Sequence, residues 1–315
     1  MREEKMTTEL LNEYRRVAYY YYKVGMTQDA IAKKMQMSRQ RVNRIVSACV
    51  KFGIVKISIE GLEQSNLELE TKLEEKYGLQ EVRIIDIVAE ETLFRDLGVE
   101  AGNCLKSIIS DKDIIGVSRG RTTVEMVENL YTPEPRWQDV IITQLIGSSR
   151  ESELQMRVDN LVYRLADKLG AKAEVQHAPV ITASPEIKQA FLKDVSCQAV
   201  YEITKACTIA IVGIGTAHSQ WKHMVSLYDK NDAQQIEWAK DVVGEVCTHF
   251  YDKNGETVVP PFRDRIMAID LEDYKKIPLR IGVAGGEQKV DAIRAALVGG
   301  YVNALVTDVH TAELL

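Results

Sequence analysis

The sequence is poor in the residues that hold metals and disulfides, with only five cysteines and five histidines among 315 residues. The cysteines are scattered, odd in number and never arranged as CxxC, which argues against a disulfide framework or a zinc site. The histidines likewise lack metal-ligand spacing. We therefore expect no metal site and no cofactor, with the thiols buried in a reducing compartment.

Long apolar stretches are also missing. No run approaches the roughly 20 residues that a membrane-spanning helix requires, and the opening sequence MREEKMTTELLNEYRR lacks the apolar core of a secretory signal. These absences predict a cytoplasmic protein with no membrane partner.

Signatures of catalysis are absent at readable spacing as well. Nothing pairs a nucleophile with a base and an orienting group. The glycines at Gly213 and Gly215 form a GxG, but the third glycine of a dinucleotide fingerprint does not follow. We predict no catalytic residues and no nucleotide-dependent redox chemistry.

Charge is unevenly distributed along the chain. Residues 1–60 hold 12 Lys and Arg against six Asp and Glu, whereas the remainder holds 28 against 40. A basic module attached to an acidic body indicates that the first part alone meets a polyanion.

Residues 1–60 carry the pattern of a helix-turn-helix domain. Apolar residues recur at helical spacing over Leu10–Tyr22. Thr27 then caps a short helix that ends at Met35, and Ser38 caps a third helix that runs to about Phe52. Residues 54–59 alternate as a β-strand does, which favours a winged-helix-like arrangement.

The third helix begins with side chains suited to reading DNA. Arg matches the major-groove edge of guanine, Gln and Asn match adenine, and the first turns of a recognition helix reach the bases. The alternative is that these residues form only the solvated face of an amphipathic helix. The predicted DNA-binding residues are Gln28, Ser38, Arg39, Gln40, Arg41, Asn43 and Arg44.

Residues 61–78 form an acidic linker. Leucines at helical spacing over Leu62–Gly78 predict a short helix with a narrow apolar stripe. The stripe suits dimerisation and packing against the following domain equally well, and both interpretations stay open.

Residues 79–315 alternate between strand-like and helix-like segments, which predicts an α/β domain with a mostly parallel sheet and ligands at the carboxyl ends of its strands. The expected strands cover residues 82–88, 114–118, 139–146, 208–213, 279–284 and 304–307. The expected helices cover residues 92–107, 122–130, 157–169 and 290–297.

Three loops that follow expected strands have binding chemistry. Gly116–Thr123 combines hydroxyls, glycine N–H groups and two arginines before a helix, a combination that cradles anions. The glycines of Ile211–Gly215 permit close approach of a ligand. Gly282–Lys289 adds a lysine for phosphate and Glu287 for sugar hydroxyls. The alternative for the first loop is an ordinary turn with surface arginines.

The sequence resembles the SorC family of sugar-responsive bacterial regulators, which is also grouped with DeoR-type proteins. The head matches in Thr27-Gln28, Ser38-Arg39 and Gly53-Ile54-Val55, although Gln36 stands where the family's turn usually has Gly. The body matches in the Gly116–Arg121 loop and in the block from Val283 to Leu315. The resemblance implies an effector domain related in fold to sugar-phosphate isomerases.

The resemblance also implies which residues line the effector pocket. Asp241 enters this set only through the matching stretch WAKDVVGEVCTHF, and the remaining members come from the loops described above. The predicted effector-binding residues are Ser118, Arg119, Gly120, Arg121, Thr122, Thr123, Asp241, Glu287 and Lys289.

Together these features predict a transcription regulator of a carbohydrate catabolic operon. Its expected partners are double-stranded operator DNA, a sugar or sugar phosphate, and further copies of the chain in a dimer or tetramer. The alternative is a sugar-phosphate-processing enzyme that carries a DNA-binding head, which the carboxylates Asp241 and Glu287 keep open.

Overall fold

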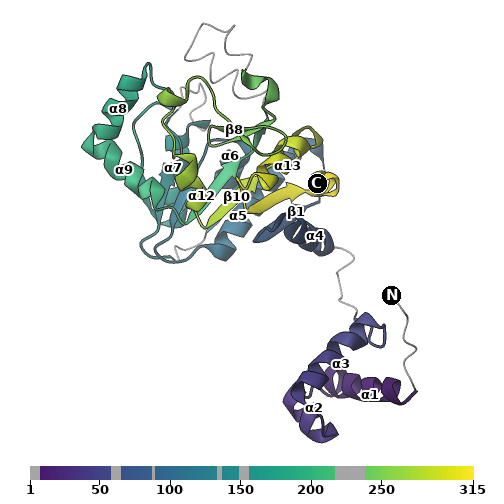
Figure 1. Cartoon of the computed structure of the whole chain (residues 1–315). Coiled ribbons are helices and arrows are strands. Elements are labelled where there is room, and N and C mark those ends of the chain that lie inside the picture. Colours follow the sequence, from purple (N-terminus) through teal and green to yellow (C-terminus); the bar gives the residue numbers. More distant parts are fainter. Residues whose placement is uncertain (1–7, 58–64, 87–88, 133–136, 149–155, 217–237) are drawn as a thin grey trace. The chain divides into compact units, whose positions relative to one another are not determined.

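The structure is a computed structural model that describes residues 8–57, 65–86, 89–132, 137–148, 156–216 and 238–315. The chain divides into two compact units, residues 1–65 and 66–315, which we call the head and the body (Figure 1).

The head consists of short helices around a small apolar core. The helices are α1 (Thr8–Ala18), the π-helical turn η1 (Tyr19–Lys23), α2 (Gln28–Met35) and α3 (Arg39–Lys51). Both expected caps are present: the hydroxyl of Thr27 accepts a hydrogen bond from Ala30 N, and that of Ser38 accepts one from Arg41 N. The core contains Val17, Ile31, Ala32, Val42, Ile45, Val46 and Cys49.

The turn between α2 and α3 places Gln36 in the left-handed region, with φ 54° and ψ 45°. This conformation is the one that glycine adopts without cost, so Gln36 carries some backbone strain. The N–H of Met37 donates to Ala32 O at 3.0 Å and closes the turn. The chain therefore keeps the helix-turn-helix shape without the glycine.

The expected strand after α3 is wrong over residues 54–57, which form a bend and irregular chain. The described part of the head offers no neighbouring strand with which this segment could pair, and an isolated strand leaves its backbone groups unsatisfied. Instead, Val55 N donates to Cys49 O at 3.0 Å and folds the segment back onto α3. Residues 58 and 59 lie outside the described residues.

The linker helix is α4 (Leu67–Tyr77), and it packs against its own body. Leu73 is buried in the core of the body, and the carboxylates of Glu70 and Glu74 accept hydrogen bonds from Ile84 N and Val82 N. Of the two interpretations that the sequence left open, the domain-packing one describes α4 in this structure.

A seven-stranded parallel sheet forms the centre of the body, in the order β1-β11-β10-β5-β2-β3-β4. Each of the six expected strands is present, and the register places Ile115 of β2 opposite Ile142 of β3 and Ile209 of β5. The bounds are β1 (Glu81–Ile85), β2 (Ile114–Val117), β3 (Ile141–Gln144), β4 (Lys172–Glu174), β5 (Ile209–Gly213), β10 (Leu279–Val283) and β11 (Ala304–Asp308).

Helices cover both faces of this sheet (Figure 1). The crossovers from β1 to β4 move toward the β4 edge of the sheet and contain α5, α6 and α7. The crossovers from β4 to β11 move back toward the β1 edge and contain α9, α12 and α13. Because crossovers between parallel strands are right-handed, the two groups of helices lie on opposite faces. The bounds are α5 (Leu93–Ile108), α6 (Arg121–Asn129), α7 (Val158–Leu169), α8 (Pro185–Lys193), α9 (Val195–Lys205), α12 (Leu271–Lys276), α13 (Val290–Val298) and α14 (Val309–Leu314).

A second, antiparallel sheet was not anticipated from the sequence. It has the order β6-β7-β8-β9, with β6 (Gly215–Thr216), β7 (Gly244–Val246), β8 (His249–Tyr251) and β9 (Thr257–Val258). Its strands have two or three residues each, too few to produce a readable alternation of apolar and polar side chains.

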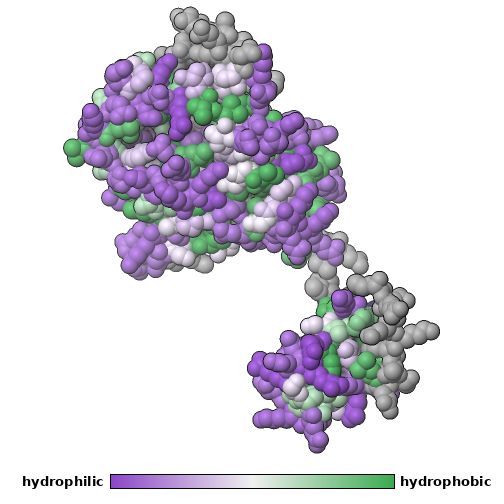
Figure 2. All heavy atoms as spheres, viewed as in Figure 1, coloured by the Kyte–Doolittle hydropathy of each residue, from purple (hydrophilic) through white to green (hydrophobic). Residues whose placement is uncertain are grey.

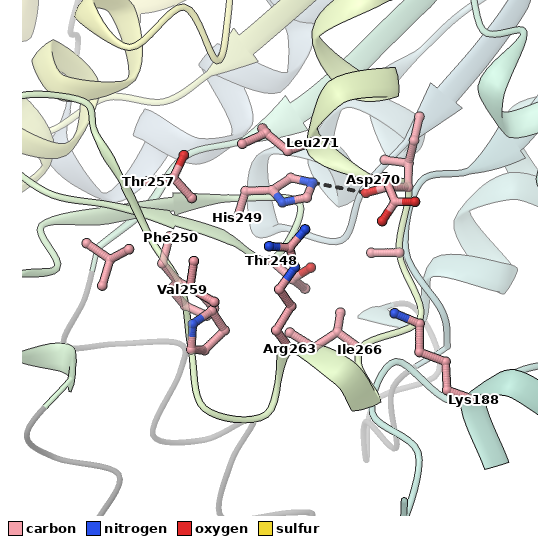
Figure 3. Close-up of a pocket in the computed structure, with 14 residues that line it drawn as sticks. Lys188, Thr248, His249, Phe250, Thr257, Val259, Arg263, Ile266, Asp270 and Leu271 are labelled. Carbon is pink, nitrogen blue, oxygen red and sulfur yellow. Dashed lines mark hydrogen bonds between the residues drawn. The ribbon is translucent and has the colours of Figure 1, made fainter. Parts of the chain in front are cut away.

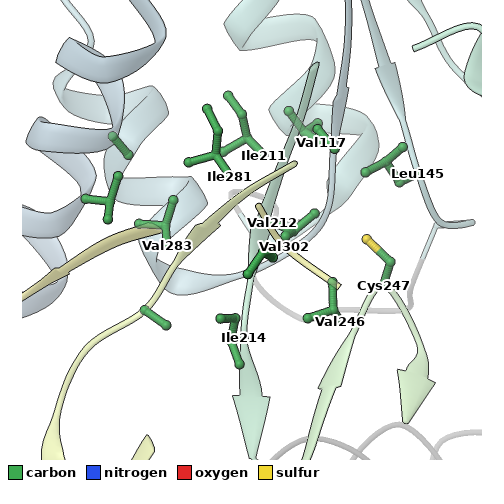
Figure 4. Close-up of a cluster of buried hydrophobic side chains, with 14 of the residues drawn as sticks. Val117, Leu145, Ile211, Val212, Ile214, Val246, Cys247, Ile281, Val283 and Val302 are labelled. Carbon is green, nitrogen blue, oxygen red and sulfur yellow. The ribbon is translucent and has the colours of Figure 1, made fainter. Parts of the chain in front are cut away.

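The two sheets share one apolar core. Figure 4 shows Val117, Ile211 and Val283 of the parallel sheet near Val246 and Cys247 of the antiparallel one. All five cysteines of the chain are buried and free. The short antiparallel sheet is thus held against the carboxyl ends of the parallel strands by hydrophobic burial.

On the face of the molecule shown in Figure 2, hydrophobic side chains are scattered among hydrophilic ones. No helix in the described ranges is both long and apolar enough to cross a membrane.

Candidate functional site

The residues predicted to contact DNA lie together on the head. Ser38, Arg39, Gln40, Arg41, Asn43 and Arg44 are all exposed, and the intervening Val42 and Ile45 are buried. Gln28 on α2 reaches this surface, since its Nε2 donates to Asn43 Oδ1 at 3.2 Å. The structure therefore brings the predicted set onto one contiguous polar surface.

The three arginines of α3 differ in their contacts. Arg41 Nη2 lies 2.9 Å from Glu13 Oε2 of α1, and Arg39 Nε lies 3.7 Å from Asp29 Oδ1 of α2. Arg44 has no ion pair or hydrogen-bonded side chain within the described part of the head. Arg44 is thus the arginine whose full charge is available to a partner.

In the body, a cavity of about 310 Å³ opens where the parallel strands end. Adjacent strands β2, β5 and β10 run parallel, so their carboxyl ends meet at one edge, and the three loops identified in the sequence leave from that edge. This is the position at which open α/β sheets bind ligands. The cavity lies at the edge that the sequence pattern predicted.

Three basic side chains line this cavity: Arg119 and Arg121 from the β2–α6 loop and Lys289 from the β10–α13 loop. The Arg121 guanidinium lies over the Phe94 ring, 4.3 Å from its centroid, which fixes its direction. Lys289 Nζ donates to Ile214 O at 2.9 Å. Residues far apart in sequence thus supply a shared positive wall.

The uncharged residues predicted in the first loop divide into two groups, those that line the cavity and those that do not. Gly120 and Thr122 line the cavity at the first turn of α6, where N–H groups face outward, and Thr122 Oγ1 donates to Val283 O at 3.1 Å. Ser118 and Thr123 are as buried as Thr122, with 3% and 0% of their surface exposed, but neither of them lines the cavity. They support the loop rather than line the cavity.

Glu245 of β7 lines the cavity and was missed from the sequence. Burial raises the pKa of this carboxyl, and Arg119 and Lys289 oppose that shift. Burial lowers the pKa of Lys289, and Glu245 opposes it. The residue stands in the stretch WAKDVVGEVCTHF, from which the sequence analysis selected Asp241 instead.

Two further predicted residues do not line the cavity, in addition to Ser118 and Thr123. Asp241 ends the 3₁₀ turn η6 (Ala239–Asp241) and is exposed, and Glu287 begins the 3₁₀ turn η8 (Glu287–Lys289) and is exposed. Gln288 lines the cavity in place of its neighbour Glu287. The 3₁₀ turn, not visible from the sequence, decides which of these consecutive side chains faces the cavity.

A buried carboxylate holds the Lys289 loop in position. Asp308, which is fully buried at the end of β11, accepts hydrogen bonds from Gly286 N at 2.8 Å and from Thr311 Oγ1 at 2.6 Å. A side chain at Gly285 would bring a Cβ to 2.2 Å from Asp308 Oδ2, and Gly286 has φ +100°. Gly285 is therefore required by this close approach, and Gly286 by its backbone conformation.

Within the described ranges, no group of three His, Cys, Asp or Glu side chains is arranged to hold a metal ion.

Residues 63–315 match the family model described as "Putative sugar-binding domain". The chain is 30% identical over 303 residues to the sorbitol operon regulator of Klebsiella pneumoniae, covering 95% of this chain and 96% of that protein. It is 29% identical to the transcriptional regulator LsrR of Escherichia coli K12, covering 95% and 93%.

The fold is also similar to solved structures. The full-length sorbitol operon regulator SorC from Klebsiella pneumoniae matches with a TM-score of 0.73 and 29% identity, over 98% of this chain and 99% of that one. The chain therefore belongs to the SorC/DeoR-type family of sugar-responsive bacterial transcription regulators.

Proposed function

We propose that the cavity at the ends of β2, β5 and β10 binds a phosphorylated sugar. The observation that carries this proposal is the convergence of Arg119, Arg121 and Lys289 on a cavity with a single lining carboxylate among the described residues, Glu245. Among the described residues, three cations against one anion give the lining a net positive charge that suits a phosphate. Glu245 then accepts hydrogen bonds from the hydroxyls of the sugar.

On the head, the proposed DNA contacts are Gln28 and the exposed face of α3 from Ser38 to Arg44. Arg44 is the proposed base-reading residue because its guanidinium forms no ion pair with the described residues of the head. To contact the DNA, Arg41 and Arg39 must give up their ion pairs with Glu13 and Asp29 or keep them while they also bind a phosphate.

Control of DNA binding requires the effector to bind the DNA-competent and DNA-incompetent states with different affinities. By its relationship to the sorbitol operon regulator, the proposed target is a carbohydrate catabolic operon. We propose a cytoplasmic homo-oligomer, since operators are usually paired half-sites read by two heads. Light scattering of the purified chain gives its mass and tests the oligomer.

Titration of the full chain with a panel of sugar phosphates and their unphosphorylated sugars tests the effector proposal. We expect calorimetry to detect binding of one or more phosphorylated members and much weaker binding of the matched sugars. The same compounds are then added to a complex with operator DNA. Binding with no change in operator affinity would contradict the regulatory role, and turnover of a bound compound would favour the enzyme alternative.

A further inference from the structure

A second pair of cavities lies elsewhere in the body, between α8 and the segment that runs from β9 to α12. One has a volume of about 70 Å³ and the other about 180 Å³, and Lys188, Ala268 and Asp270 line both. None of their lining residues lines the cavity at the strand ends. The two cavities adjoin at these three shared residues, and we call them together the α8 site; Figure 3 shows the smaller one.

The donors at the α8 site lack partners. Lys188 and Arg263 approach the cavity from α8 and from η7 (Arg263–Arg265), as Figure 3 shows, and neither side chain forms an ion pair or hydrogen bond with the described residues. Gln176 is 7% exposed and lines the larger cavity, and its Nε2 is buried without an acceptor. A buried donor without an acceptor destabilises the protein, and an acceptor on a ligand would remove that cost.

The acceptors at the site are fewer. His249 Nε2 lies 3.0 Å from Ile269 O, which can only accept, so Nε2 carries the proton. Burial lowers the pKa of His249 to about 4, so the ring is neutral near pH 7 and its Nδ1 is an acceptor. Asp270 Oδ2 already accepts from the Tyr201 hydroxyl at 2.9 Å. Among the described residues, the site therefore presents two unpaired cations against the single carboxylate of Asp270, together with one unpaired amide and an imidazole acceptor.

We propose that the α8 site binds a small hydroxylated anion, distinct from the phosphorylated sugar at the strand ends. Lys188 and Arg263 hold the negative group, the Gln176 amide donates to it or to a neighbouring oxygen, and His249 Nδ1 accepts from a hydroxyl. Arg263 and His249 line the cavity of about 70 Å³ and Gln176 lines the one of about 180 Å³. Each is smaller than the strand-end cavity of about 310 Å³, which favours a compound more compact than a sugar phosphate.

The test uses the full chain with the strand-end cavity disabled by Arg121→Gln and Lys289→Met. Inorganic phosphate and glycerol 3-phosphate are titrated into this background by calorimetry. We expect both to bind, glycerol 3-phosphate the more tightly because it carries hydroxyls. Adding Lys188→Met should weaken both at least tenfold, and Lys188→Arg should retain binding because it keeps the charge.

Lys193→Met is the matched control, since Lys193 lies on the same helix, is exposed and lines neither cavity. Equal binding by the Lys188→Met and Lys193→Met proteins would overturn the proposal, as would no binding to the background protein. If Lys188→Met instead lowers the mass measured by light scattering and the background binds neither anion, this surface is a contact between copies of the chain. Equal affinity for the two probes would refute the role given to His249.

Discussion

The head and the body build their candidate sites in opposite ways. On the head, every proposed contact lies between Gln28 and Arg44, on two helices joined by one turn, and all of the side chains except the half-buried Gln28 are exposed. In the body, the cavity draws on residues from Phe94 to Lys289, and its single described carboxylate comes from a different sheet than its cations.

The contrast shows what each kind of site depends on. The surface of α3 requires only that the helix forms and that Val42 and Ile45 face the core, which local spacing determines. The cavity requires that three loops end at one edge and that the β7–β8 hairpin packs above them. A change of charge should therefore act locally on the head, whereas the body should respond through several elements.

The largest effect is expected from Lys289→Met. Removal of a half-buried cation from the proposed phosphate-binding cavity should weaken effector binding by about 2–5 kcal/mol, measured by calorimetry. Operator affinity without effector should stay at the wild-type value, because the head forms its surface from its own residues. Lys253→Met, at an exposed position outside the cavity, serves as the control. A parallel loss of operator affinity in a folded Lys289→Met protein would break the separation of head and body.

Acid should destabilise the body through His249. Its pKa is lowered to about 4 in the folded state, mainly by burial, from an ordinary value of 6.5. The unfolded chain therefore binds the extra proton between these pH values, and stability falls as the pH drops from 6.5 to 4, by about 3 kcal/mol in total. Urea unfolding followed by tryptophan fluorescence reports this change for the body alone, since the head has no Trp or His.

His249→Gln should flatten that pH dependence, because the Gln amide can donate to Ile269 O without titrating in this range. The exposed His177→Gln should leave the dependence as in the wild type. An unchanged slope in His249→Gln would show that another group dominates acid unfolding.

The smallest effect concerns the arginines of the head. Arg44→Ala should cost about 1–3 kcal/mol of operator binding if the side chain reads a base. Arg41→Ala should cost less, because Arg41 must give up or share Glu13 to contact DNA. Fluorescence anisotropy at one fixed salt concentration measures both. Equal losses for the two variants would show that the ion pair with Glu13 does not reduce the contribution of Arg41 to operator binding.

Much of the fold could be predicted from local pattern. Thr27 and Ser38 cap the expected helices, and the long apolar segments became the strands β1, β2, β3, β5, β10 and β11. The predicted strand at 54–57 failed because alternation alone supplies no pairing partner. The antiparallel sheet was missed because strands of two or three residues have no readable period.

Part of the site in the body could also be predicted, because local patterns located the long strands. Arg119, Arg121 and Lys289 stand directly after long strands, so their place at the carboxyl edge followed from the alternation. Glu245 stands on a short strand whose position depends on burial of Val246 and Cys247 against the parallel sheet. No local rule distinguishes it from Asp241 in the same stretch, since only tertiary packing decides which acid faces the cavity.

The placement of Glu245 on a separate hairpin has a consequence for how such a cavity can diversify. The turn after β7 keeps Cys247 and Thr248 at positive φ, and Glu245 accepts a hydrogen bond from Thr248 N at 3.0 Å, so this hairpin is stabilised by its own contacts. If the cavity binds a sugar phosphate as proposed, substitutions in the hairpin change the contacts to the sugar and leave the basic residues of the β2–α6 and β10–α13 loops in place. A regulator with this arrangement can change its effector specificity while it keeps the basic residues proposed to bind the phosphate.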